Sequence, residues 1–239
     1  MVRLSRTLML LFVALAAVLA CAPTPATEPT GDTPKPTADP PASPTPLPSP
    51  TPTPTQVIRA RVEGDPKDLI VKLADLPPGF SQVTEEYDGP NKYAVVYFSP
   101  EAFAAEAPSE AELMAVAANL TLHGDAAAAG EQFETEEGLD DKSIADSMAS
   151  ASGEATLILV QPYPVQLAGT DQAKAVRVDY EVGPMAVVDY RCRFVVGNAV
   201  VNLIATARNV GTGLDAFAVE GQAQVIAERQ VERLLQASR

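Results

Sequence analysis

One stretch of the chain contains two adjacent strands and the turn between them: Val187-Val-Asp-Tyr-Arg-Cys-Arg-Phe-Val-Val-Gly-Asn-Ala-Val-Val-Asn-Leu-Ile-Ala-Thr-Ala207. Side chains alternate along Val187–Val196, which is typical of a strand with one buried face. Gly197-Asn198 allows positive φ angles at a two-residue hairpin turn, and Val200–Ala207 returns as the second strand. The predicted inner face consists of Val188, Tyr190, Cys192, Phe194 and Val196. The predicted outer face carries Asp189, Arg191 and Arg193.

The residues around this hairpin predict an α+β domain. Alternation and short apolar runs indicate further strands at Phe80–Tyr87, Lys92–Phe98, Leu113–His123, Thr156–Val160 (of the buried type) and Ala175–Val182. Along Leu113–His123, one face is expected to comprise Met114, Val116, Ala118, Leu120 and Leu122. We expect a mainly antiparallel sheet that packs one face on helices.

Three helices are expected around this sheet. Asp65-Pro66 is typical of an N-cap followed by the first helical residue, and the helix should run to Leu73 before the prolines of Asp75–Phe80 end it. A second, Ala-rich helix covers about Ala126–Glu136, and a long C-terminal helix covers Leu214–Ala237. The apolar stripe of the last helix is Val219, Ala223, Ile226, Ala227, Val231 and Leu234.

The chain opens on a basic and then apolar segment. Arg3 and Arg6 precede an uncharged run of fourteen residues, Thr7–Ala20, which is shorter than the roughly 20 residues of a membrane-spanning helix. Val18-Leu-Ala-Cys21 resembles the lipobox of bacterial lipoproteins. That resemblance implies lipidation of the Cys21 thiol, removal of residues 1–20 and anchoring on the extracytoplasmic face of a bacterial membrane. The alternatives are an ordinary signal peptide cut near Ala20 or Ala22, or an uncleaved short anchor.

A Pro/Thr-rich segment follows the cysteine. Residues 22–56 contain 13 prolines and 9 threonines, so this segment has little to bury and few backbone donors for a helix or sheet. Such a sequence favours polyproline II at about 3.1 Å per residue, a reach on the order of 100 Å. We therefore expect a signal peptide at 1–20, a lipidated cysteine with a disordered linker at 21–56, and one domain at 57–239.

Charge is distributed unevenly along the chain. The formal net charge is −14, which disfavours nucleic acid as a partner. Residues 57–156 hold 20 acids and 6 bases, whereas residues 157–239 hold 8 of each. The densest run, Glu131–Asp141, is a cation site, a docking surface for a basic partner, or a solvated helix end. Its spacing does not match an EF-hand loop, and the solvated helix end is the preferred interpretation.

Catalytic motifs are missing from the sequence. There is no Gly-x-Ser-x-Gly, Walker or dinucleotide fingerprint, and the single histidine, His123, has no neighbouring signature. Cys192 is expected to pack in the core rather than to act as a nucleophile. Arg177, Arg191 and Arg193 are expected on one exposed sheet face, neutralised across strands by Asp179, Glu181 and Asp189. No catalytic, metal or cofactor-binding residue is predicted, and no cofactor.

Leu73-Ala-Asp-Leu-Pro-Pro-Gly-Phe80 resembles a turn near the start of secreted bacterial domains of unassigned function. The later order of strands and helices is similar to extracytoplasmic sensor-like or PsbP-like lipoprotein domains. These resemblances imply a non-catalytic module that binds a small ligand or an envelope protein. One alternative is an envelope hydrolase with paired carboxylates in the acidic half, one of them buried. The other is a structural envelope protein without a concave site.

Overall fold

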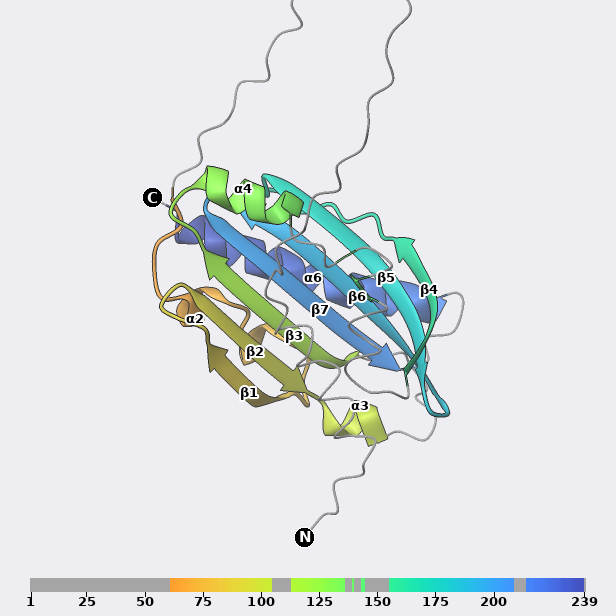
Figure 1. Cartoon of the computed structure of the whole chain (residues 1–239). Helices are drawn as coiled ribbons and strands as arrows, with labels where there is room; N and C mark the ends of the chain where they lie inside the picture. Colours follow the sequence, from red (N-terminus) through yellow and green to blue (C-terminus); the bar gives the residue numbers. More distant parts are fainter. Residues whose placement is uncertain are drawn as a thin grey trace, which may run out of the picture. The chain divides into compact units, whose positions relative to one another are not determined.

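A seven-stranded sheet forms the centre of the protein. The computed structural model describes residues 61–104, 113–135, 139, 143–144, 155–208 and 214–238. The strand order is β1-β2-β3-β7-β6-β5-β4, and every neighbouring pair is antiparallel (Figure 1). The strands are β1 (Ser81–Tyr87), β2 (Lys92–Phe98), β3 (Leu113–Leu122), β4 (Ala155–Pro162), β5 (Gln172–Val182), β6 (Met185–Val196) and β7 (Ala199–Arg208). The predicted α+β class with an antiparallel sheet is confirmed.

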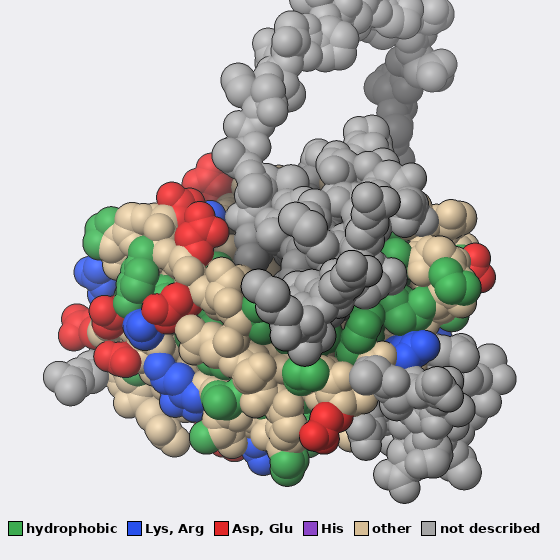
Figure 2. Space-filling model, turned by 90° about the horizontal axis from the view of Figure 1, so that it is seen from below, with side chains coloured by type: hydrophobic (Ala, Val, Ile, Leu, Met, Phe, Trp, Pro, Cys, Tyr) green, Lys and Arg blue, Asp and Glu red, His purple; other side chains and the backbone are tan. Residues whose placement is uncertain are grey.

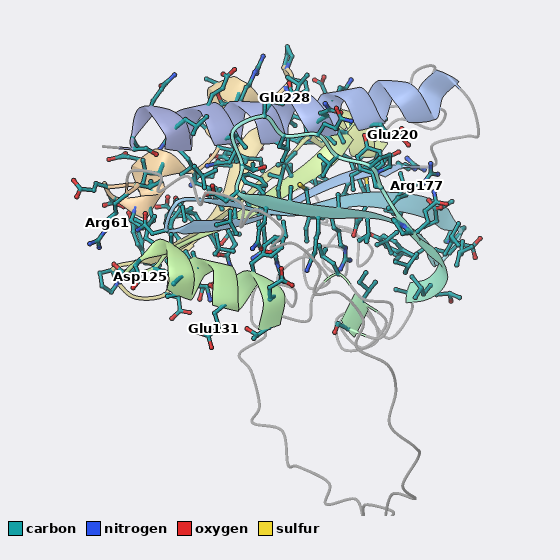
Figure 3. All side chains as sticks on the ribbon, turned by 90° about the horizontal axis from the view of Figure 1, so that it is seen from above. Arg61, Asp125, Glu131, Arg177, Glu220 and Glu228 are labelled. Atoms are coloured by element: carbon teal, nitrogen blue, oxygen red, sulfur yellow. The ribbon has the colours of Figure 1, made fainter. Side chains whose placement is uncertain are left out.

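Helices cover both faces of the sheet, not one face as the sequence suggested. The long helix α6 (Leu214–Gln236) lies on one face, and α4 (Ala126–Thr135) lies on the other (Figure 3). All six residues of the predicted stripe on α6 are buried. Ala129 and Phe133 of α4 pack against Val195 and Val200. A strand pattern reveals that a face is buried, but it does not reveal which helix covers it.

The central strands contribute buried residues to both faces of the sheet. In β6, Tyr190, Cys192 and Phe194 join the core under α6, as their alternation predicted. In β3, Val116, Ala118 and Leu120 do the same. Met114 was expected on that face but lies in the core on the opposite side. A register shift between Leu113 and Ala115 inserts one extra residue at this point, and this reverses the alternation.

The first helical segment is shorter than predicted. Asp65 caps α2 (Pro66–Leu69) by accepting a hydrogen bond from the Lys67 backbone N–H at 2.8 Å. The chain becomes extended at Ile70 and then forms a separate 3-10 turn, η1 (Leu73–Asp75), before the predicted stop. The helix thus stops after one turn, and Leu73 is 45% exposed instead of lying on a buried helical stripe.

The entry of the chain into the domain is fixed by the hairpin turn of β6 and β7. The backbone N–H of Val62 donates to Asn198 Oδ1 at 2.7 Å, and Asn198 Nδ2 donates to the His123 carbonyl at 2.9 Å. Val62 also forms a bridge with Ser238, just after α6. Asn198, singled out as a turn residue, therefore also joins three distant segments.

Strand β4 departs from the prediction of a buried strand. It is the outermost strand beside β5, and its Ile158 and Leu159 are 57% and 45% exposed. A short α3 (Pro100–Ala104) follows β2. Residues 143–144 are helical, and Ile144 is buried. Residues 1–20 and 21–56 lie outside the described residues. Within the described ranges, no helix combines the length and apolar character needed to cross a membrane.

Candidate functional site

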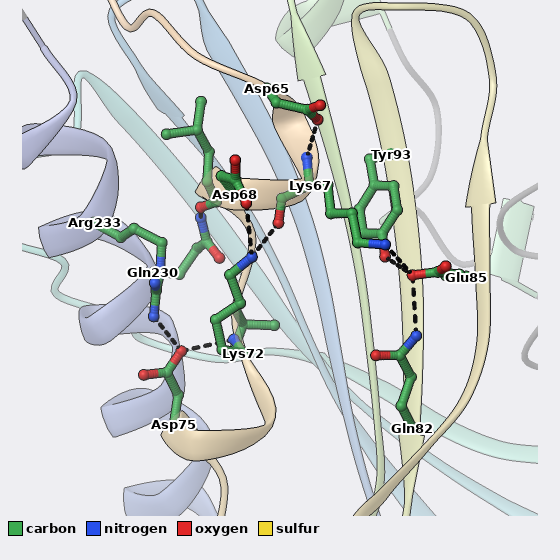
Figure 4. A network of polar contacts seen from close by, with 12 residues as sticks. Asp65, Lys67, Asp68, Lys72, Asp75, Gln82, Glu85, Tyr93, Gln230 and Arg233 are labelled. Atoms are coloured by element: carbon green, nitrogen blue, oxygen red, sulfur yellow. Dashed lines mark hydrogen bonds and ion pairs between the residues drawn. The ribbon is translucent and has the colours of Figure 1, made fainter.

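A pocket of about 320 Å³ lies between α2, η1 and the first two strands. We call it the α2–β2 pocket. Its lining combines two ammonium groups, two phenol rings, one amide and three apolar side chains: Lys67, Lys72, Tyr93, Tyr97, Gln82, Ile70, Leu73 and Ala74. Figure 4 shows the polar contacts around it. Pockets that bind small molecules typically have this composition, an apolar lining with a few polar groups that orient the ligand.

The wall of the pocket is tied to the sheet and to α6. Tyr97 Oη donates to the Val71 carbonyl at 3.0 Å, which joins β2 to the segment after α2. Asp75 Oδ2 accepts from the Lys72 backbone N–H at 2.7 Å and from Arg233 Nη2 at 2.5 Å. Gln230 Nε2 donates to the Leu69 carbonyl at 2.8 Å. These bonds hold the irregular segment 70–75 in place although it has little secondary structure.

Glu85 of β1 accepts hydrogen bonds from three side chains on one side of the pocket. Its Oε2 accepts from Tyr93 Oη at 2.6 Å, from Lys67 Nζ at 2.9 Å and from Gln82 Nε2 at 3.1 Å. The Tyr93 hydroxyl, followed by Lys67 and Gln82, lowers the pKa of Glu85 to about 2. Burial, together with the bond to Glu85, raises the pKa of Tyr93. The carboxylate is therefore ionised and the phenol neutral at physiological pH.

Of the two lysines that line the pocket, Lys72 forms the longer ion pair with an acid. Its Nζ lies 3.7 Å from Asp68 Oδ1, on a side chain that is 82% exposed, and it also donates to the Lys67 carbonyl. Ion pairs with such exposed partners contribute little free energy, so a ligand anion can replace Asp68 at low cost. The pocket thus offers one exchangeable ammonium group beside two tyrosine rings.

A second polar cluster is buried on the sheet face that carries α4. Asp189 Oδ1 accepts from Thr206 Oγ1 at 2.8 Å and from Tyr180 Oη at 3.2 Å, and its Oδ2 accepts from Arg191 Nη2 at 2.9 Å. Asp189, Arg191 and Thr206 are each at most 5% exposed. Burial and the nearby Asp189 carboxylate raise the pKa of Tyr180. Each of these contacts satisfies a buried polar group, so the cluster is a structural network.

The three arginines do not share an exposed sheet face, and this prediction is wrong. Arg191 and Arg193 are buried on the α4 face, and Arg193 Nε donates to Asn202 Oδ1 at 2.6 Å. Arg177 lies on the opposite face, where it pairs with Asp179 at 3.0 Å and approaches Glu220 of α6 at 3.7 Å (Figure 3). Arg177 and Arg191 have acidic partners, but these lie along a strand at positions i and i+2 and on α6, rather than across strands.

The candidate nucleophile is buried, as predicted. Cys192 is 9% exposed, and burial raises the pKa of its thiol to about 12. A thiol with so high a pKa is unreactive at physiological pH. His123 lies just after β3, and no hydrogen-bond partner is found for its buried Nε2 among the described residues. None of the hydrogen bonds among the described residues joins His123 to Cys192.

None of the described acids of residues 57–156 is buried. Each described acid of residues 57–156 is exposed or, in the case of Asp75, partly buried. No group of three or more His, Cys, Asp or Glu side chains within the described ranges could hold a metal ion. Of the acidic run Glu131–Asp141, Glu131 and Glu134 are described and exposed on α4. These two residues agree with a solvated helix end.

Sequence reasoning missed the α2–β2 pocket. Its residues come from α2, η1 and two strands, and no spacing rule connects Lys72 with Gln82 or Tyr93. Tyr93 and Tyr97 recur on one face of β2, but this spacing does not by itself indicate a pocket. No family model matches the chain, and the comparison with curated proteins finds no match.

Proposed function

We propose that this protein is a lipid-anchored binding module on the extracytoplasmic face of a bacterial membrane, and that the α2–β2 pocket is its ligand site. The anchor is acylated Cys21, and the Pro/Thr-rich residues 22–56 hold the domain away from the membrane. The ligand class is a small anion with an apolar or aromatic body. The domain acts by binding, without catalysis.

The sequence of the first 56 residues supports the anchor and the spacer. A basic pair, a short apolar run and Val18-Leu-Ala-Cys21 together form the pattern of a lipoprotein signal. Two or three acyl chains hold a protein stably at a membrane, because each buried methylene contributes about 0.8 kcal/mol.

The composition of the α2–β2 pocket is the observation that carries the ligand class. Tyr93, Tyr97 and Ile70 contribute an apolar lining of which each residue is at most 3% exposed, while the Lys72 ammonium provides a charge that an anion can reach. Glu85 remains ionised and accepts hydrogen bonds from Tyr93, Lys67 and Gln82. It therefore holds these three lining side chains in position. An apolar anion gains contact area and one charge-assisted bond at once.

A pair of probes with the same ring system and different charge tests this proposal. We expect saturation-transfer NMR on the full chain to detect 2-naphthoate at least fivefold more strongly than 2-naphthylmethanol. Lys72→Met should lower the affinity for 2-naphthoate at least fivefold, because it removes the ammonium and keeps the apolar stem. Lys174→Met is the matched control, since Lys174 pairs with Glu134 on α4 and does not line the pocket.

The same experiment can overturn the ligand class or the site. Equal binding of the charged and neutral probes would contradict the role of Lys72. Absence of binding by both probes, or an equal loss in Lys72→Met and Lys174→Met, would contradict the α2–β2 pocket as the ligand site.

Observations on the described residues favour the proposed binding module over both alternatives, the structural protein and the hydrolase. A structural envelope protein was expected to have no concave site, and the α2–β2 pocket is one. A carboxylate hydrolase needs two converging acids, one of them in apolar surroundings. The buried acid Asp189 lies outside residues 57–156 and is bonded to Arg191, Tyr180 and Thr206.

A further inference from the structure

The α2–β2 pocket lies in the acidic half of the chain, where carboxylates oppose the binding of an anion. Residues 57–156 hold 20 acids and 6 bases. In the space-filling view from below, red and blue side chains lie interspersed on the left, on the side of α2 and β1 (Figure 2). An anion site in these surroundings requires that the carboxylates closest to it be neutralised by cations other than its own lysine.

Asp75 is the least exposed of the acids that contact pocket-lining residues in the described part of the chain. Its side chain is 16% exposed, against 41% for Glu85 and 82% for Asp68. Its Oδ2 accepts from the backbone N–H of Lys72 at 2.7 Å, so its charge is held beside the residue that carries the exchangeable ammonium. Burial raises the pKa of the Tyr97 phenol, and Asp75 raises it further. The field of Asp75 thus disfavours a negative charge at the lining of the pocket.

Arg233 of α6 supplies the opposing charge, 158 positions along the chain from Asp75. Its Nη2 donates to Asp75 Oδ2 at 2.5 Å, and Figure 4 shows Arg233 and Lys72 on opposite sides of the Asp75 carboxylate. Arg233 acts on the pKa of Tyr97 in the opposite direction to Asp75. Both partners are largely buried, so water and salt screen their fields less than those of surface charges.

We propose that Arg233 determines the charge specificity of the α2–β2 pocket. By neutralising Asp75, it allows Lys72 to select an anion over a neutral ligand of the same shape. This inference rests on the proposed function of the pocket. Arg233 does not line the pocket, so it is a positioning residue that acts on the ligand through Asp75. Because specificity is a difference of two affinities, it separates this role from a merely structural one.

Arg229, about one turn earlier on α6, provides a matched comparison. Its Nη1 donates to the backbone carbonyl of Asp75, whereas Arg233 donates to the carboxylate. Arg229 is also exposed. Replacement of either arginine removes one positive charge and one bond between α6 and η1. Only the replacement of Arg233 takes the cation away from a largely buried carboxylate.

Saturation-transfer NMR titrations of the full chain with 2-naphthoate and 2-naphthylmethanol test the proposal. The quantity measured is the charge preference, defined as the Kd for 2-naphthylmethanol divided by the Kd for 2-naphthoate. We expect Arg233→Gln to lower the charge preference at least threefold through weaker binding of 2-naphthoate, while the Kd for 2-naphthylmethanol changes less than twofold. Arg229→Gln should change the charge preference less than twofold, and Arg233→Lys should retain it.

Removal of the carboxylate separates the effect of charge from that of structure. Asp75→Asn keeps a side-chain oxygen for the Lys72 N–H but removes the charge, so it should raise the charge preference at least twofold. In the Arg233→Gln chain, the same substitution should restore the charge preference to at least the wild-type value. Far-UV circular dichroism checks the fold of each variant. If Arg233→Gln does not fold, Asp75→Asn alone decides, because an unchanged preference there would overturn the inference.

The outcomes distinguish failure of this inference from failure of the proposed function. The inference is overturned if Arg233→Gln and Arg229→Gln have equal effects, or if Asp75→Asn does not restore the charge preference of Arg233→Gln. The proposed function survives these results as long as Lys72→Met still lowers the charge preference. Equal affinity of the wild-type chain for both probes would overturn the proposed ligand class, and this inference with it.

Discussion

At the scale of single residues, stability depends on a few buried polar groups whose partners lie close along the chain or on the next strand. Asp189 is the clearest example, because this 2% exposed carboxylate is paired with Arg191 two residues away. A buried ion pair adds little net stability, but the loss of one partner leaves a buried charge uncompensated. The side-chain alternation predicted which residues share a face with Asp189. It did not predict that this polar face is buried.

The pair Asp189–Arg191 has a matched counterpart in Asp179–Arg177, which has the same spacing and lies partly in solvent. We expect Asp189→Ala to lower the free energy of unfolding by about 3–5 kcal/mol. We expect Asp179→Ala to lower it by about 1 kcal/mol, since solvent and Glu220 still stabilise Arg177. Urea unfolding measures both values, and equal losses would contradict the role given to burial.

Glu85 gives the stability of the domain a specific pH dependence. Its pKa is about 2 in the folded protein against a usual value of 4.5, so folding favours its ionised form. The corresponding stability is fully present above pH 4.5 and is lost as the pH falls from 4.5 towards 2. We expect Glu85→Gln to lose this component of acid sensitivity, as followed by urea midpoints between pH 6 and pH 2.5.

The neighbouring Glu86 provides the control for this pH effect. Glu86→Gln removes the same formal charge from the same strand, but Glu86 points to the other side of β1. Its urea midpoints should fall with acid as steeply as those of the wild type. If Glu85→Gln and Glu86→Gln have the same pH profile, the network of Glu85 with Tyr93 and Lys67 does not act as described.

At the scale of elements, the sequence predicted helices and strands well wherever one periodicity held over eight or more residues. The hairpin Val187–Ala207 and the stripe on α6 are found as expected. The wrong predictions have local causes. A register shift places Met114 on the opposite face, and α2 ends after a single turn because the backbone is extended at Ile70. Strand β4 is exposed because it lies at an edge of the sheet. An apolar run such as β4 has the same sequence pattern whether it lies in the centre or at the edge of a sheet. Its position cannot be predicted from the run itself, because strand order depends on distant residues.

Helix α6 stabilises the domain through its inner stripe, and adjacent residues separate this effect from helix propensity. Ile226 is 2% exposed and Val225 is 44% exposed. We expect Ile226→Ala to lower the free energy of unfolding by about 2–5 kcal/mol through cavity formation. Val225→Ala should change it by less than about 0.5 kcal/mol, because alanine favours a helix and little buried area is lost. Chemical denaturation of both variants decides the matter, and similar losses would refute the packing assignment.

At the scale of the whole molecule, the proposed arrangement is an acyl anchor, a spacer and a sheet domain that carries the α2–β2 pocket. Two regions of the sequence contributed differently to this account. The first 56 residues carry composition signals that can be interpreted without a structure. The α2–β2 pocket has no such signal, since it depends on how segment 70–75 is fastened to α6 and β2.

The lipid anchor also determines how the chain partitions between membrane and soluble fractions. We expect Cys21→Ala to block lipidation and the cleavage coupled to it, so the chain should accumulate at its full length with residues 1–20 still attached. Wild-type protein should be shorter and should remain in the membrane fraction after high-salt washing, because acyl chains and not charges hold it. Immunoblotting of fractions for both proteins measures this, and processing of Cys21→Ala to the wild-type length would contradict the lipobox assignment.

The mass of the N-terminal peptide of the native, membrane-extracted protein is the most direct measurement. Our account predicts that this peptide begins at Cys21 and carries a thioether-linked diacylglycerol, with or without an additional amide-linked acyl chain. A peptide that begins at Met1, or one that begins at Cys21 or Ala22 without lipid, would contradict the proposed anchoring.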